Sequence, residues 1–305
     1  MRGVFMGASD VVPGVSGGTM AFILGIYEEL IESIRMLGEP QFLKALFGLR
    51  IAQALAMINW KFLLAVGAGI GIAVLTLAHS LEWLLINHPV FLWSFFFGLV
   101  LASVFVVAQR VSRWMLRRIA ALVAGAVGAF LLVGLVPVQT PETWWFLFLS
   151  GALAICAMIL PGISGAFILL LLGKYQFVLS AVTQRDVLTL AIVALGAAIG
   201  LVTFAQILGR LFERYHDTTV ALLTGLMIGS LRKVWPWKED VRWLREANGN
   251  FLLDSAGQRI VIEQSDVLPT LASAGDITNF IVAMLLATAG LAAILLLNRL
   301  AARQS

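Results

Sequence analysis

Two short stretches, PGVSGGT at residues 13–19 and PGISG at residues 161–165, interrupt long apolar runs and decide the fold. The runs extend over residues 3–34 and 144–182. Proline and clustered glycines stop a helix, and lipid cannot satisfy the freed backbone groups, so each break must be buried in protein or line a polar cavity. Each run is therefore predicted to form a re-entrant helical hairpin.

The helix that follows each break is predicted to be short. Tyr27 and Tyr175 lie 11 positions after Ser16 and Ser164, respectively, or roughly 17 Å at 1.5 Å per residue. This is about half of a bilayer core about 30 Å thick. If one hairpin enters from each face, the two tips are expected to meet near the middle of the membrane.

The two breaks belong to an internal repeat. A shift of 148 residues superposes Pro13, Gly14, Ser16, Gly17, Leu24, Gly25 and Tyr27 on Pro161, Gly162, Ser164, Gly165, Leu172, Gly173 and Tyr175. Farther along, Gly98 and Ser103 align with Gly225 and Ser230 at an offset of 127. The first half thus carries 21 extra residues (148 minus 127), which we assign to an amphipathic helix at 41–60 lying at the membrane interface.

The composition is that of an integral membrane protein. Of 305 residues, 60% are hydrophobic and 12% charged, against roughly 45–50% and about 25% in soluble domains. Cys156 is the only cysteine, no metal-ligand set is recognisable, and no cofactor is expected. Six membrane spans are predicted besides the hairpins: Phe62–Leu85, Pro89–Ala108, Ile119–Val136, Val187–Leu208, Val220–Leu231 and Ile277–Leu297.

The distribution of Lys and Arg predicts the orientation. Four arginines lie in loop 109–118, whereas loops 79–88 and 137–143 carry no Lys or Arg. The positive-inside rule places loop 109–118 in the cytoplasm and the loops at Asn87 and Gln139 outside, so both termini are cytoplasmic. Because the cations flank apolar runs, the net charge of +4 reflects topology, and no nucleic acid partner is expected.

The predicted fold is an all-α polytopic membrane protein of two inverted repeats, residues 1–140 and 141–305. Each repeat has one hairpin and three spans, and because three is odd, the second repeat is inverted relative to the first. Residues 232–276 are then extracytoplasmic. A small β-hairpin or lid is predicted there, with two β-prone runs around Ser255, Ala256 and Gly257.

The helix ends after the breaks are suited to an anion. Each has unsatisfied backbone N–H groups and the positive end of a helix dipole. Ser16 and Ser164 are good N-cap residues, and Gly17, Gly18 and Gly165 let a ligand approach the backbone, with Thr19 as a further donor. Two such ends are predicted to hold a substrate at the midplane of an inverted-repeat transporter. Alternatively, the breaks are only tight turns and the serines only caps.

Three charged residues are further candidates. Asp10 precedes the first break and has Met158 as its counterpart, so it breaks the symmetry of the repeat. It is either a coupling site for a proton or cation, or a cap that accepts backbone N–H bonds. Arg117 and Arg118 are candidate phosphate ligands, although topology alone explains their position.

A different class of protein shares one motif. Both breaks contain the Gly-x-Ser-Gly string of rhomboid-type intramembrane serine proteases. Such an enzyme needs a histidine base within hydrogen-bond reach of the serine. His79, His88 and His216 are all predicted at span ends, away from a midplane serine, so proteolysis is disfavoured.

The stretches GASDVVPGVSGGTMAFILGIYEELIESI (7–34) and MILPGISGAFILLLLGKY (158–175) resemble the bacterial polyprenyl-phosphate transporter family. The resemblance implies a non-enzymatic flippase of the inner membrane that returns undecaprenyl phosphate to the cytoplasmic leaflet, recycling the carrier for peptidoglycan and other envelope polymers. Transport of a small soluble anion and a non-transporting scaffold are the competing readings. By motif, the resemblance implies functional roles for Asp10, Pro13, Gly14, Ser16, Gly17, Gly18, Thr19, Pro161, Gly162, Ser164 and Gly165.

Overall fold

The computed structural model describes residues 1–11, 16–138, 140–243 and 261–302. Pro13, Gly14 and Gln139, for which the sequence makes predictions, lie outside these ranges. Within them the elements are, in chain order, α1 (Arg2–Val11), α2 (Gly17–Ile23), α3 (Tyr27–Arg35), η1 (Met36–Gly38), α4 (Pro40–Phe47), α5 (Ile51–Met57), α6 (Trp60–Asn87), α7 (Pro89–Ala108), α8 (Leu116–Val133), α9 (Trp144–Ile159), α10 (Gly165–Leu171), α11 (Tyr175–Gln184), α12 (Val187–Ser230), β1 (Lys238–Trp243), β2 (Val261–Asp266) and α13 (Ala274–Ala302).

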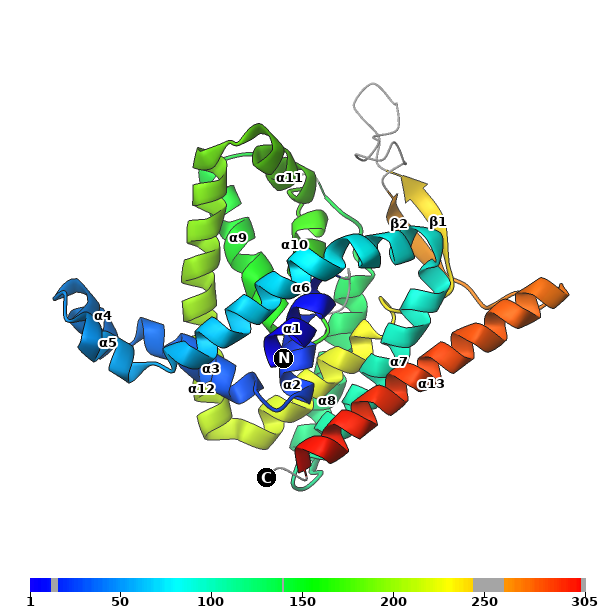
Figure 1. The fold of residues 1–305 in the computed structure, drawn as a ribbon, viewed down its shortest axis with the longest axis horizontal. Coiled ribbons are helices and arrows are strands. Elements are labelled where there is room, and N and C mark those ends of the chain that lie inside the picture. The colour runs from blue at the N-terminus through cyan, green and yellow to red at the C-terminus, as the bar shows by residue number, and fades with distance from the viewer. Residues whose placement is uncertain (12–15, 139, 244–260, 303–305) are drawn as a thin grey trace.

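The chain is a mostly helical, multi-pass membrane protein (Figure 1). Among the described residues, five helices are long and apolar enough to cross a membrane: α6, α7, α8, α12 and α13. The bent pair of α10 and α11 makes a sixth candidate. Large apolar side chains such as Leu75, Leu131 and Leu285 are exposed on these helices, as expected for surfaces that face acyl chains.

The predicted spans Val187–Leu208 and Val220–Leu231 both lie within α12, and the helix is interrupted between them at Tyr215, as the sequence predicts. Helix α12 has 44 residues, or about 66 Å at 1.5 Å per residue, roughly twice the bilayer core. It changes direction at Tyr215, whose φ of −138° and ψ of 43° are not helical (Figure 1). A single residue therefore separates a longer segment before the bend from a shorter one after it.

Both apolar runs are interrupted where the sequence predicts. Helix α1 ends at Val11 and α2 begins at Gly17, while α9 ends at Ile159 and α10 begins at Gly165. The helices after the breaks are shorter than predicted, because they end at Ile23 and Leu171 instead of continuing to the tyrosines.

A left-handed glycine ends each of these short helices. Gly25 and Gly173 have φ of +70° and +64°, a conformation typical of the residue just past a helix C-terminus. The next amide closes the turn in both copies, from Ile26 to the Ala21 carbonyl at 2.9 Å and from Lys174 to the Leu169 carbonyl at 2.8 Å. After the second turn the chain bends by 106° into α11.

The single amphipathic helix predicted at 41–60 is wrong in detail. The structure has two short helices, α4 and α5, which extend from one side of the molecule (Figure 1). Gly48 ends α4, and Leu49 turns the chain with a φ of +56°. Phe47 and Leu49 are more than four-fifths exposed, at 82% and 83%, so the tip of this pair is apolar.

The predicted β-hairpin is partly confirmed. Strand β2 overlaps the second of the two predicted runs, and it pairs antiparallel with β1, with Lys238 opposite Asp266. Its partner, β1, was not predicted as a strand. The first predicted run and the turn at residues 255–257 lie outside the described residues. The indole of Trp235 donates to the Val267 carbonyl at 2.9 Å, which ties the sheet to the segment after α12.

Equivalent residues of the sequence repeat pack in equivalent ways. A Cβ at Gly3 in α1 would overlap the carbonyl of Val66 in α6, and a Cβ at Gly151 in α9 would overlap the carbonyl of Val193 in α12. These pairs are related by the offsets 148 and 127 found in the sequence. Small residues let helix backbones approach closely in a membrane, so both crossings require glycine.

Glycines also bring α7 against α13 and α8 against α12. Gly98 of α7 lies against Ala287 of α13, and Gly225 of α12 lies against Leu122 of α8, in both cases too closely for a Cβ. His88 and Tyr215, which the offset of 127 relates, also share a non-helical backbone conformation. His88, between α6 and α7, has φ −137° and ψ 51°, close to the values for Tyr215.

The end of α2 and the start of α3 form the centre of the core. Phe22, Ile26 and Tyr27 are almost completely buried, and the ring of Tyr27 lies 4.7 Å from that of Phe22 and 5.9 Å from that of Phe212. Aromatic pairs of this kind contribute roughly 0.5–1.5 kcal/mol beyond area burial. Helix α2 is therefore held firmly inside the bundle, with the first break at its N-terminus.

Candidate functional site

The N-terminus of α2 is capped by two side chains. Ser16 is the N-cap residue, and its hydroxyl oxygen accepts a hydrogen bond from the Gly18 amide at 3.1 Å. The Gly17 amide donates to the Asp10 carboxylate at 2.7 Å. A carboxylate is stabilised at this end of a helix by the dipole and the free amides. Asp10 therefore caps the turn, which is one of its two predicted roles.

The two breaks meet, as predicted from the lengths of the hairpins. The Ser16 hydroxyl donates to the carbonyl of Met158 at 2.7 Å. The Thr19 hydroxyl accepts from the Gly162 amide at 2.9 Å. Ser16 and Thr19 are each only 1% exposed, so these bonds form in a dry environment, where an unmade hydrogen bond is costly.

The glycines of the motifs are positions of close packing. A Cβ at Gly17 would overlap the Asp10 carboxylate, and one at Gly18 would overlap the Ile159 carbonyl. Gly165 lies equally tightly, with a Cβ expected 2.7 Å from the Ala154 carbonyl oxygen. The expectation that these glycines leave the amides open does not hold at Gly17 or Gly18, whose amides already donate to Asp10 and Ser16.

The second break differs from the first in its cap. Ser164 has the extended backbone of an N-cap residue, yet its side chain makes no capping hydrogen bond. Pro161 and Gly162 form the turn between α9 and α10, and Gly162 adopts a φ of +88°. A Cβ at Gly162 would also lie 2.5 Å from the hydroxyl of Ser230, so both conformation and space require glycine at this position.

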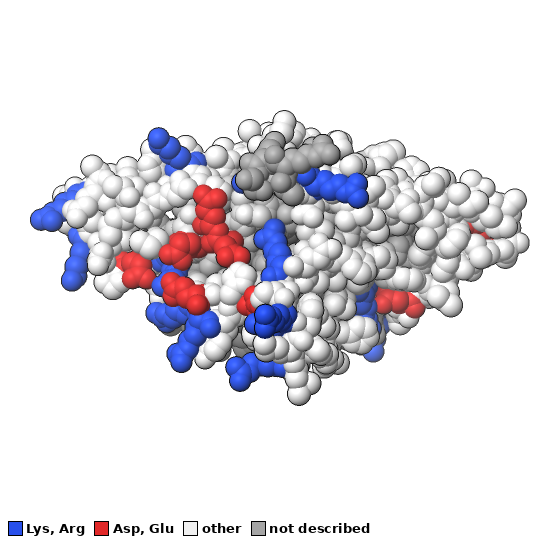
Figure 2. Space-filling model, turned by 90° about the horizontal axis from the view of Figure 1, so that it is seen from below, with Lys and Arg blue, Asp and Glu red and all other residues white. Residues whose placement is uncertain are grey.

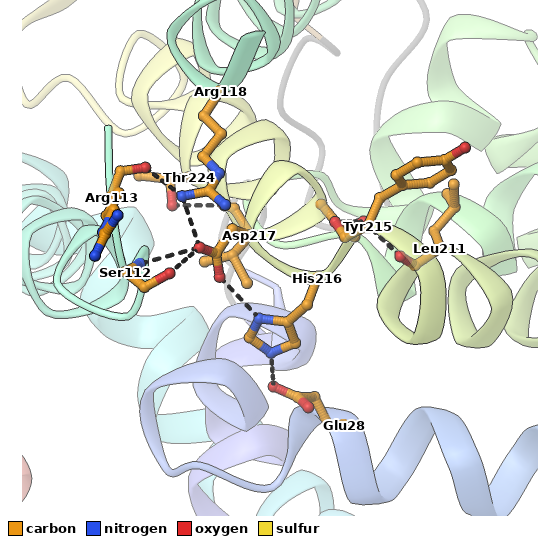
Figure 3. Close-up of polar contacts among 11 residues, drawn as sticks. Glu28, Ser112, Arg113, Arg118, Leu211, Tyr215, His216, Asp217 and Thr224 are labelled. Atoms are coloured by element: carbon orange, nitrogen blue, oxygen red, sulfur yellow. Dashed lines mark hydrogen bonds and ion pairs between the residues drawn. The ribbon is translucent and has the colours of Figure 1, made fainter. Parts of the chain in front are cut away.

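Arg117 and Arg118 do not lie at the breaks. They begin α8 and line an open cavity of about 660 Å³ together with Glu213, Arg214 and His216. Figure 3 shows Arg118 directed at Asp217, with which it forms an ion pair of 2.9 Å. The described contacts of Arg118 are with Asp217 and the Arg113 carbonyl, so the structure does not bring it to the breaks.

A network of polar side chains surrounds this ion pair (Figure 3). Asp217 also accepts from the Ser112 amide at 3.2 Å, and it lies 3.3 Å from Nδ1 of His216. The other ring nitrogen of His216 lies 3.2 Å from Glu28 of α3. The network thus joins the loop after α7, the bend of α12 and the first hairpin.

Acidic and basic side chains gather on the face seen in Figure 2. Both signs of charge are present there, so this face is not a single basic patch. Among the described ion pairs, Arg35 bonds to Glu213 and lies 3.2 Å from Glu32. Exposed pairs of this kind contribute little to stability, about 0–1 kcal/mol each.

One basic cluster was missed by the sequence interpretation. Arg232, Lys233 and Lys238 line a small cavity near the end of α12, which also includes Phe167 and Leu170 of α10. Arg232 and Lys233, adjacent cations directly after a span, could have indicated this cluster from the sequence. Lys238, in contrast, reaches the cavity only because β1 pairs with β2.

These features define a class of protein: a multi-pass helical membrane protein in which two interrupted helical segments meet inside the bundle. The comparison with protein families is specific. Residues 6–252 match the family described as VCA0040-like, undecaprenyl phosphate translocase-like. The chain belongs to this family, which confirms the resemblance carried by the two Pro-Gly-x-Ser-Gly motifs.

Two relatives agree with this assignment. The chain is 45% identical over 269 residues to a polyprenyl-phosphate transporter of Vibrio cholerae serotype O1, covering 88% of this chain and 84% of the relative. It is 29% identical over 255 residues to a polyprenyl-phosphate transporter of Staphylococcus aureus, covering 77% of this chain and 85% of the relative. No solved structure matches the chain significantly.

Proposed function

We propose that the protein is a flippase for a polyprenyl phosphate, undecaprenyl phosphate, and moves it from the outer to the cytoplasmic leaflet. The names of the two relatives support the substrate class. The observation that carries the mechanism is the contact between the breaks, in which Ser16 bonds to Met158 and Thr19 to Gly162. This recycling would serve peptidoglycan and other envelope polymers.

The polar groups of the breaks are paired with one another in this structure. Separating the breaks would release the Ser16 hydroxyl, the Thr19 hydroxyl and the Gly162 amide. All three can donate hydrogen bonds, and a phosphate carries acceptor oxygens that match them. We therefore assign the phosphate to this place in an open state, with Gly17, Gly18, Ser164 and Gly165 forming its walls.

Two inverted repeats, residues 1–140 and 141–305, account for how the breaks are separated. The proposal is supported by the equivalent crossings at Gly3 and Gly151 and by the matching backbone of His88 and Tyr215. In inverted-repeat transporters, one repeat rocks against the other around a site at the bilayer midplane. The charge distribution places both termini in the cytoplasm and residues 232–276 outside the inner membrane.

Asp10 is the proposed coupling residue for a proton or cation. One of its carboxylate oxygens bonds to Gly17, and the other is buried without a hydrogen-bond partner among the described residues. An ionisable group at such depth is functional by default. Asp10→Asn preserves an acceptor for the Gly17 amide and removes the charge, so transport should lose its dependence on an imposed ion gradient and the fold should persist.

The function is tested by a leaflet-resolved assay. Purified protein in vesicles is given a polyprenyl phosphate in one leaflet, with a soluble anion as the control substrate. Movement of the lipid phosphate but not of the anion supports the flippase. Transport of the soluble anion would support an aqueous carrier, and movement of neither, with both breaks dry, would support a scaffold.

A further inference from the structure

The segment between α12 and β1 builds a cationic pocket that the breaks do not use. The cavity has a volume of about 100 Å³ and lies between the end of α8, the side of α10 and strand β2. Its charged lining consists of Arg232, Lys233, Lys238 and Asp266. Gly134, at the end of α8, lies at the opposite end of that helix from Arg117, so this pocket is separate from the network of Figure 3.

Each cation lies near an aromatic ring. The ammonium of Lys233 lies 4.9 Å from the ring centre of Phe167, and that of Lys238 lies 4.7 Å from the ring centre of Trp93. Lys238 also donates to the Lys233 carbonyl. Cation–π contacts orient a cation without neutralising its charge, so both lysines remain available to an anion.

Arg232 is fixed in the same way. Its guanidinium lies 4.6 Å from the Phe130 ring centre and 3.5 Å from the Asp266 carboxylate. A Cβ at Gly134 would come 2.5 Å from one of its nitrogens, so the glycine makes room for it. Three basic side chains face one acidic side chain, which leaves two formal positive charges (3 minus 1) in a cavity of limited size.

Grouping lysines in a partly enclosed cavity is unfavourable without an anion. Burial, together with the charge of Lys233, lowers the pKa of Lys238 to about 7, although Asp266 opposes the shift. Burial also lowers the pKa of Lys233. Protein stability alone would favour apolar residues at these positions, because burying unpaired charges costs free energy. The arrangement is therefore suited to a charged ligand.

We propose that Arg232, Lys233 and Lys238 form a loading site for the phosphate monoester head group of the lipid substrate. This inference rests on the proposed function and deepens it by naming where the head group first binds. Phe167 and Leu170 line the pocket from α10, which begins at Gly165 directly after the second break. The seven residues of α10 cover only about 10 Å, so the loading site lies close to the break.

A lipid source of the phosphate is favoured over free phosphate by the neighbouring surface. The same segment carries Trp235 and Trp237, which line an apolar cavity of about 300 Å³ between α7 and α13. Lys238 contacts Trp93 of α7, the helix that also contributes Ser94 and Phe97 to the apolar cavity. A ligand with a charged head and an apolar chain matches both cavities, whereas inorganic phosphate matches only the first.

The test measures binding of farnesyl phosphate to the purified full-length protein in nanodiscs, with inorganic phosphate and farnesol as comparison probes. Lys233→Gln and Lys238→Gln should each raise the Kd for farnesyl phosphate about tenfold or more, since each removes a charge-assisted hydrogen bond. Arg185→Gln is the matched control, because Arg185 is an exposed cation outside the pocket. Lys233→Arg keeps the charge and should bind within a few fold of wild type.

Each result bears on one claim. If both Gln variants are monodisperse and bind farnesyl phosphate as wild type does, while wild type flips polyprenyl phosphate, the loading site is refuted and the function stands. If wild type neither binds farnesyl phosphate nor flips the lipid, the proposed function fails. If inorganic phosphate binds as tightly as farnesyl phosphate, the pocket is not a lipid site.

Discussion

The hydroxyl of Thr19 accepts a hydrogen bond from the amide of Gly162, a residue 143 positions farther along the chain. Because both groups are buried at the junction of the two breaks, this bond connects the halves of the molecule at their centre. Its loss would leave the Gly162 amide without an acceptor in a dry place. The first prediction follows from this bond.

Thr19→Val should destabilise the closed arrangement of the breaks by about 1–3 kcal/mol, which is the usual cost of an unsatisfied buried donor. The measurement is the unfolding midpoint of the purified protein together with its rate of lipid flipping. Thr19→Ser retains the hydroxyl and should remain close to wild type. Equal stability and flipping in Thr19→Val and wild type would show that the bond is unimportant.

Ser16→Ala should impair the protein more than Ser164→Ala. Ser16 caps α2 and also bonds across the breaks, whereas Ser164 makes no capping bond. Loss of an N-cap costs about 0.5–2 kcal/mol, so flipping by Ser16→Ala should fall only in part. Complete loss of activity, together with covalent labelling of Ser16 by a serine-directed probe, would instead favour an intramembrane protease.

Gly18→Ala should disrupt the junction, because its Cβ would overlap the carbonyl of Ile159. Gly67→Ala in α6 is the matched control, since a Cβ there meets nothing within 4 Å. We expect Gly18→Ala to lower the unfolding midpoint and to block flipping, and Gly67→Ala to leave both unchanged. Unimpaired flipping by well-folded Gly18→Ala, and likewise by Gly17→Val and Gly165→Val, would show that the breaks are only structural turns.

The proposed topology is tested with introduced cysteines. In a Cys156→Ser background, cysteines at Asn87 and Gln139 should react with an impermeant thiol reagent added outside, because their loops carry no Lys or Arg. A cysteine at Arg113 should react only after permeabilisation. The reverse pattern of labelling would contradict the inverted arrangement of the halves.

Binding of farnesyl phosphate should weaken as the pH rises from 7 to 9. The pKa of Lys238 is lowered to about 7, so its ammonium is present below that pH and is lost above it. The other charges facing it are Lys233, Arg232 and Asp266. The phosphate head group, with a second pKa of about 6, is already a dianion throughout this range. Lys238→Arg should flatten the profile, and an unchanged decline in that variant would exclude Lys238 as its cause.

Most of the fold could be predicted because hydrophobic length and helix-breaking residues are local properties of the sequence. Pro89–Ala108 is found with the predicted bounds, and both breaks lie where proline and glycine predict them. The early ends of α2 and α10 had a signal too, since Leu24-Gly25 and Leu172-Gly173 are typical helix-ending pairs. The break in α12 at Tyr215 falls in the predicted interval between two spans, but its extent of a single residue could not be predicted, because so short a bend leaves no mark in composition.

The candidate site could be predicted only in part. The sequence indicated that the two breaks would meet, and Ser16 and Thr19 make the contacts. Their partners are the Met158 carbonyl and the Gly162 amide, backbone groups that a residue pattern does not reveal. The placement of Lys238 beside Lys233 depends on the pairing of β1 with β2, which is a tertiary feature.

The pairing of helices distant in sequence has a consequence for how such a chain can be divided. Helix α13 lies against α7, and α8 lies against α12, through glycines that admit no side chain. A fragment ending after α8 would leave Gly98 and Gly125 facing lipid instead of a neighbouring backbone. Neither this fragment nor the remainder of the chain, which begins after α8, should be stable alone. Synthesised together as separate polypeptides, the two fragments should regain function, because each supplies the helices against which the other packs.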